Sequence, residues 1–175
     1  MHLVLGALPQ AVGASHVTRP LLVLCLGNPD RGDDGLGAAV AEVLDGTLPP
    51  DVTLMARSGD MLTMLEDWAG FDALVCVDAA GGGDRPGRIH RIDLAEEDLP
   101  RDMAFLSSHA FGLGEAIALA RTLDLAPADI VVYAVEGQRF DGGSEMTPPV
   151  AAAIGPVAER ITAEVARLRE AANHA

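Results

Sequence analysis

Short apolar runs alternate with segments of helical periodicity along most of the chain. Residues 21–26, 73–77 and 130–135 are continuous apolar runs, as expected of parallel strands that are buried on both faces. Weaker alternation predicts two more strands at 52–56 and 88–94, the second at a sheet edge. Helices are predicted from 34 or 35 to 44, over 60–68 and 111–123, and from 148 or 149 to about 172; Val43 and Leu62 are among the apolar positions expected on their buried faces.

This order of elements predicts an α/β fold. Strands separated by helices imply right-handed crossovers and a mostly parallel central sheet with helices on both faces, which is a three-layer α/β/α arrangement. The alternating segment 88–94 is expected to be an antiparallel edge strand, and residues 95–108 are acidic and then irregular. Residues 20–175 are expected to form a single domain.

Residues 1–19 are predicted to be a poorly ordered leader or an extra edge segment. No Lys or Arg precedes their apolar stretch, which is too short to cross a bilayer, and no other segment approaches that length. We therefore expect a cytoplasmic protein.

Charge and composition exclude several classes of function. The net charge of −14 would repel nucleic acid and anionic membranes, so a basic protein segment is a better partner. All 12 basic residues are Arg, which excludes Schiff-base chemistry and a phosphate-binding lysine. Cys25 and Cys76 lie within apolar runs, and we expect both to be buried strand residues.

Polar residues gather where the apolar runs end. Asp34 follows the first strand, Asp78 comes directly after the apolar run at 73–77, and His109 precedes the helix at 111–123. In an open α/β sheet, ligands bind outside the carboxyl ends of the strands. Two carboxylates and an imidazole can form a three-ligand site for nickel or zinc with open positions for substrate or water.

Two choices underlie this candidate site. Asp33 and Asp34 are adjacent, so both cannot easily face one ligand; we assign Asp33 to supporting the loop and capping the following helix, and Asp34 to the site. His90 is set aside because it lies in an alternating strand, and the remaining histidines lie near the chain ends. This leaves His109 as the candidate ligand.

Several motifs occur in the order found in one known family. Residues 24–37 (LCLGNPDRGDDGLG), 77–79 (VDA) with 83–87 (GDRPG), and 108–109 (SH) with 112–113 (GL) are followed by 135–136 (VE) and 146–148 (MTP). Together they resemble the hydrogenase maturation endopeptidases, over residues 21–172.

The resemblance implies a three-layer α/β fold and a specific activity. It implies an endopeptidase that removes the carboxyl-terminal extension of a hydrogenase large-subunit precursor, with Asp34, Asp78 and His109 binding nickel that the precursor carries. The family has Glu or Asp at the first of these positions, and zinc or cadmium could substitute for nickel. Water would attack the peptide carbonyl, activated either by the metal or by an aspartate acting as general base.

Three alternatives stay open at this point. A metal checkpoint would bind the same precursor without cutting it. A serine hydrolase would need Ser144 or Ser108, although the chain has no Gly-x-Ser-x-Gly motif. A nucleotide-binding domain would use the glycine-rich residues 27–37, but their acidic residues stand where phosphate needs N–H groups and positive charge.

Overall fold

The computed structural model describes residues 20–58, 61–100, 104–105 and 112–174. The expected leader at 1–19 lies outside these residues. The strands are β1 (Leu21–Leu26), β2 (Val52–Arg57), β3 (Ala73–Gly81), β4 (Ile89–Asp93), β5 (Ala104–Phe105) and β6 (Asp129–Glu136). The helices are α1 (Leu36–Leu44), α2 (Met61–Trp68), α3 (Leu113–Thr122) and α4 (Pro148–His174), with a short 3₁₀ turn, η1 (Gly32–Gly35), before α1.

The described strands form one mostly parallel sheet in the order β2-β1-β3-β6-β4. Strands β2, β1, β3 and β6 run parallel to one another, and β4 is the antiparallel edge strand beside β6. This confirms the predicted sheet. Strand β5 was not predicted; it pairs antiparallel with the last two residues of β3.

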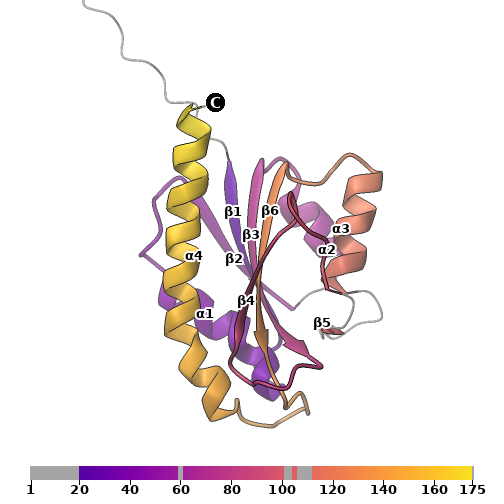
Figure 1. Cartoon of the computed structure of the whole chain (residues 1–175), viewed down its shortest axis with the longest axis vertical. Coiled ribbons are helices and arrows are strands. Elements are labelled where there is room, and N and C mark those ends of the chain that lie inside the picture. The colour runs from indigo at the N-terminus through magenta and orange to yellow at the C-terminus, as the bar shows by residue number, and fades with distance from the viewer. Residues whose placement is uncertain (1–19, 59–60, 101–103, 106–111, 175) are drawn as a thin grey trace, which may run out of the picture.

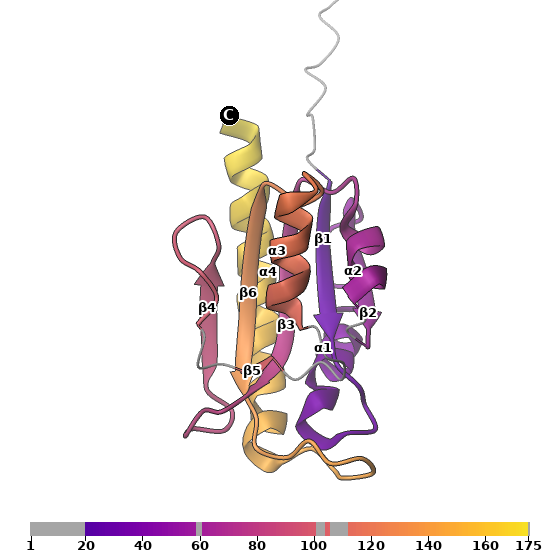
Figure 2. The same cartoon turned by 90° about the vertical axis from the view of Figure 1, so that its right-hand side faces the viewer.

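Helices cover both faces of the sheet. Helices α1 and α4 lie on one face, and α2 and α3 lie on the other (Figures 1 and 2). Alternate strand residues point to opposite faces, and both sets are apolar here: Val23, Val75 and Val131 face α1 and α4, while Leu24, Cys76 and Val132 face α2 and α3. Burial on both faces explains why these strands appear in the sequence as continuous apolar runs.

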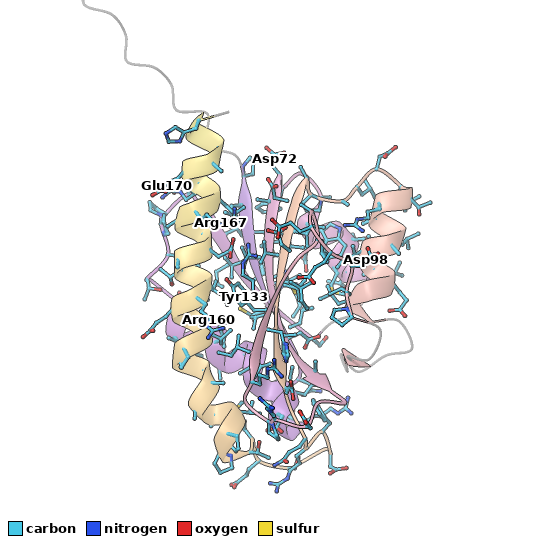
Figure 3. All side chains as sticks on the ribbon, viewed as in Figure 1. Asp72, Asp98, Tyr133, Arg160, Arg167 and Glu170 are labelled. Carbon is cyan, nitrogen blue, oxygen red and sulfur yellow. The ribbon has the colours of Figure 1, made fainter. Side chains whose placement is uncertain are left out.

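The carboxyl-terminal helix is joined to the sheet by an ionic cluster around the buried carboxylate of Glu164. Glu164 of α4 accepts hydrogen bonds from Arg91 of β4, Tyr133 of β6 and Arg167 of its own helix. Figure 3 labels Arg160 and Arg167 of α4 and Tyr133 of β6. Burial acts to raise the pKa of Glu164, but the two arginines and the tyrosine outweigh it and lower that pKa to about 2.

The structure corrects three details of the sequence analysis. Strand β3 does not end at Asp78; it continues to Gly81, because small residues there pair with both β6 and β5. Val43 and Leu62 are not buried, with exposed fractions of 48% and 65%. Val43 lies at the edge of the buried stripe of α1, and Leu62 lies on the far side of α2 from its buried stripe. The residues that these helices bury are Leu36, Val40 and Leu44 in α1 and Met64, Leu65 and Trp68 in α2.

Cys25 and Cys76 are buried free thiols in β1 and β3, as predicted. Burial raises the pKa of Cys25 to about 12, and burial together with the charges of Asp78 and Cys25 raises that of Cys76 well above its ordinary value. Neither thiol is therefore suited to act as a nucleophile. None of the described helices is long and apolar enough to cross a membrane.

Candidate functional site

The turn after β1 brings an acidic residue back toward the sheet. Gly27 has φ +133°, and a Cβ atom there would lie 1.9 Å from the carbonyl oxygen of Asp34. Only glycine allows both this backbone conformation and this close approach. The 3₁₀ turn η1 therefore packs against the end of β1, at the edge where the parallel strands end (Figure 2).

Asp34 is fully buried without a hydrogen-bond donor among the described residues. Both carboxylate oxygens are inaccessible and have no hydrogen-bond partner among the described residues, and Oδ2 makes only a long ion pair with the Arg31 guanidinium at 4.0 Å. Burial raises the pKa of Asp34; the nearby backbone of Asn28 and the charge of Arg31 offset only part of this effect. An unpaired buried carboxyl is costly to folding, so its presence indicates a role outside stability.

Asp78 has the same properties on the neighbouring strand β3. It is fully buried, and neither carboxylate oxygen has a hydrogen-bond partner in the described part of the chain. Burial is the main reason that its pKa is raised well above the ordinary value, the charge of Asp34 adds to the effect, and the nearby backbone N–H of Ala79 offsets only part of it. The two carboxyl groups are thus close enough to repel each other when both are ionised. A divalent cation between them would offset both the cost of burying the two charges and the repulsion between them.

The third predicted ligand, His109, lies outside the described residues. Within the described ranges, no group of three His, Cys, Asp or Glu side chains is arranged to hold a metal ion. The structure therefore brings together two of the three predicted site residues, Asp34 and Asp78. The role assigned to His109 stays a prediction.

Asp33, adjacent to Asp34, has the opposite environment. Its Oδ2 accepts hydrogen bonds from the backbone N–H groups of Gln138 and Arg139, and its Oδ1 accepts from the N–H and the hydroxyl of Thr147. Burial would raise the pKa of Asp33, but these four donors outweigh it and the pKa is lowered. The prediction that Asp33 supports the loop is confirmed.

The prediction that Asp33 caps a helix is wrong. Neither η1 nor α1 has a side-chain cap, and the four donors to Asp33 all belong to the segment between β6 and α4. Asp33 joins two loops that are more than a hundred residues apart in sequence. Sequence spacing gives no indication of this, because the donors are mainly backbone groups of a distant segment.

A second polar pair, Glu136 and His90, lies at the same edge of the sheet, and His90 was not among the site residues predicted from sequence. Glu136, the last residue of β6, has a nearly buried carboxylate whose Oε1 lies 2.6 Å from Nε2 of His90 on β4. Its Oε2 accepts a hydrogen bond from the Arg85 N–H. Burial would raise the pKa of Glu136, but the Arg85 N–H and His90 outweigh it and lower that pKa. The alternation of 88–94 could have shown that His90 faces the same side of the sheet as Ile92, but its pairing with Glu136 follows only from the register of β4 with β6.

Comparison with known proteins identifies relatives over most of the chain. The HycI family model, described as hydrogenase maturation protease, matches residues 40–164. The hydrogenase expression/formation protein HupD of Bradyrhizobium diazoefficiens is 28% identical over 141 residues, which is 78% of this chain and 72% of the relative. The hydrogenase 2 maturation protease of Escherichia coli is 27% identical over 154 residues, which is 86% of this chain and 91% of the relative.

Solved structures show the same fold. The hydrogenase maturating endopeptidase HybD from E. coli is 22% identical with a TM-score of 0.67, covering 84% of this chain and 92% of its own. The [NiFe] hydrogenase maturation protease HybD from Thermococcus kodakarensis is 22% identical with a TM-score of 0.63, and the match covers 81% of this chain and 98% of that protein. Because the family model matches well over half of the residues, the chain belongs to the hydrogenase maturation protease family and is, by that membership, a peptidase.

Proposed function

We propose that this peptidase removes the carboxyl-terminal extension of a nickel-loaded hydrogenase large-subunit precursor. In this proposal Asp34, Asp78 and His109 bind the nickel that the precursor carries. The observation that supports it most strongly is the pair of buried carboxyl groups of Asp34 and Asp78, which have no hydrogen-bond partner among the described residues and whose charges repel each other. The name of the E. coli relative, a hydrogenase 2 maturation protease, supports the class of substrate.

The chemistry of the donors suits a borderline divalent cation. Oxygen from two carboxylates and nitrogen from one imidazole are ligands that nickel and zinc accept, so zinc or cadmium could replace nickel in experiments. Three protein ligands leave coordination positions for groups of the precursor. The metal then acts as part of the substrate, and its binding positions the scissile bond next to the carboxyl groups.

The reaction we propose is attack of water on the scissile peptide carbonyl. A carboxylate at this edge of the sheet, from Asp34 or Asp78, can take a proton from this water as general base. An aspartate that takes the proton and a metal that polarises the carbonyl are two routes to the same products. Both require the two carboxyl groups at one edge of the sheet.

The test is processing of a purified nickel-loaded precursor, followed by mass spectrometry of the released tail. Asp34→Asn, Asp78→Asn and His109→Ala should each slow release at least about 100-fold. Asp84→Asn is the matched control, because Asp84 is an exposed acid in the loop that follows β3 and should leave the rate unchanged. Normal release by Asp78→Asn would refute the proposal.

The same experiment separates the alternatives. A metal checkpoint would bind the nickel-loaded precursor and never shorten it. A serine hydrolase would lose activity in Ser144→Ala, but the Ser144 hydroxyl donates to the Asp141 carbonyl oxygen at 2.6 Å and so belongs to a turn. We also propose a cytoplasmic location, which the two free cysteines favour because the cytosol keeps thiols reduced.

A further inference from the structure

His90 and Glu136 form an oriented pair on the face of the sheet that carries Asp78. Asp78 and Ala134 are register partners on β3 and β6, and Ala134 and His90 are register partners on β6 and β4. Register partners point to the same face, so Asp78, Ala134 and His90 form one row across three strands. The middle member, Ala134, has only a methyl side chain and is fully buried, so the row gives the separation of Asp78 and His90 and is not itself an open groove.

The dimensions of this row suit an extended peptide. Neighbouring strands are about 4.8 Å apart, which separates the backbones at Asp78 and His90 by roughly 10 Å. An extended peptide rises about 3.3 Å per residue, so this separation corresponds to about three residues of substrate. A chain that has its metal at Asp34 and Asp78 can therefore reach His90 with a residue about three positions away.

The imidazole has one nitrogen committed to the protein and one available. Nε2 faces the Glu136 carboxylate at 2.6 Å, and since a carboxylate is an acceptor, Nε2 carries the proton. In the described part of the chain Nδ1 makes no hydrogen bond, and the side chain is 22% exposed. Glu136 is itself held in place by the Arg85 N–H and by the chain at Gly83, where a Cβ atom would overlap the carboxylate.

We propose that His90, oriented by Glu136, binds a main-chain peptide group of the precursor through Nδ1. A neutral imidazole offers this nitrogen to a peptide N–H, and an imidazolium offers its N–H to a peptide carbonyl oxygen. His90 is thus a substrate-binding residue, and Glu136 is a positioning residue that fixes the ring. This inference rests on the proposed function, because it requires a peptide substrate at Asp34 and Asp78.

Two substitutions of His90 separate substrate binding from a structural role. Asn places an amide close to the position of Nδ1 but does not reach Glu136, whereas Gln places its amide close to Nε2 and keeps the contact with Glu136. If Nδ1 binds substrate, His90→Gln and His90→Ala should raise KM for the nickel-loaded precursor about fivefold to tenfold, with kcat within about twofold. His90→Asn should raise KM less than His90→Gln does.

Arg91→Gln is the matched structural control. Arg91 is the next residue on β4, faces α4 on the opposite side of the sheet, and holds the strand through Glu164. The Arg91→Gln substitution should lower the unfolding temperature without raising KM for the precursor. Processing by the unmodified protein is measured first, and its absence would contradict the proposed function.

With processing established, two results would overturn the role of His90. One is a KM for His90→Ala equal to that of the unmodified protein. The other is a KM that is unchanged in His90→Gln and raised in His90→Asn. That order would mean that only the contact with Glu136 matters. Urea unfolding of all four variants keeps loss of fold apart from loss of binding.

Discussion

Replacing Asp33 by alanine removes one carboxylate that holds two distant loops together. The four donors to this carboxylate lie at distances of 2.7 to 3.0 Å, and all of them come from residues 138–147. In the alanine variant these donors lose their acceptor. The change therefore tests whether Asp33 acts on the fold while the adjacent Asp34 acts on the substrate.

The magnitude follows from what surrounds each donor. Thr147 is buried, so its N–H and its hydroxyl would each stay unsatisfied at a cost of about 1–3 kcal/mol. Gln138 and Arg139 are exposed residues, and water can replace much of what their N–H groups lose. We expect Asp33→Ala to lower the free energy of unfolding by about 3–5 kcal/mol, more than the 0.5–2 kcal/mol or so expected for loss of a helix cap.

The pH dependence gives an independent check. The folded-state pKa of Asp33 is lowered, so its contribution is fully present above its ordinary pKa and is lost as the pH falls through the lower folded-state value. The difference in unfolding free energy between the unmodified protein and Asp33→Ala should therefore be constant near neutral pH and shrink below about pH 4.

Urea unfolding followed by circular dichroism measures this difference, and Asp34→Asn is the control from the adjacent position. Because Asp34 has no hydrogen-bond donor among the described residues, its amide variant should be at least as stable as the unmodified protein. It should nevertheless fail to process the precursor. An Asp33→Ala variant with unchanged unfolding free energy and no activity would refute this reasoning and exchange the roles of the two residues.

Two further predictions use the other buried acids. The pKa of Asp78 is raised, so its ionisation destabilises the fold as the pH rises above the ordinary pKa of an aspartate. Asp78→Asn should therefore raise the unfolding temperature at pH 7 by roughly 2–4 °C, measured by calorimetry. A lowered unfolding temperature would contradict this prediction. The pKa of Glu164 is lowered to about 2, so Glu164→Gln should cost about 1–3 kcal/mol of unfolding free energy at pH 7, discounted for its partly exposed arginine partners. That cost should shrink between about pH 4.5 and pH 2, and urea titrations that show a constant cost would exclude the ionic explanation.

The fold could be predicted from sequence because its dominant signal is local. A parallel strand buried on both faces needs a continuous apolar run, and β1, β3 and β6 each contain one. What could not be predicted depends on distant pairing. The last residues of β3 and the short β5 exist because they pair with each other, and two alanines and a glycine carry no strand signal of their own.

The candidate site could be predicted in part for a similar reason. Carboxyl ends of neighbouring parallel strands meet at one edge, so Asp34 and Asp78 could be placed together from the order of the strands. The partner of His90 could not, because it depends on which strand lies beside β4. Once the antiparallel pairing of β4 with β6 is known, the side chains of His90 and Glu136 necessarily lie on the same face of the sheet.

Buried acids at this edge of the sheet and beneath α4 show how the fold separates stability from function. Asp33, Glu136 and Glu164 each have donors for both carboxylate oxygens, and the pKa of each is lowered. Asp34 and Asp78 are buried as deeply, have no such donors in the described part of the chain, and have raised pKa values. Backbone N–H groups are available close by, since they serve the adjacent Asp33. One residue of a neighbouring pair is saturated and the other has only a long ion pair with Arg31. Burial alone therefore does not explain Asp34, and the metal ion that we propose the precursor carries would supply the missing positive charge.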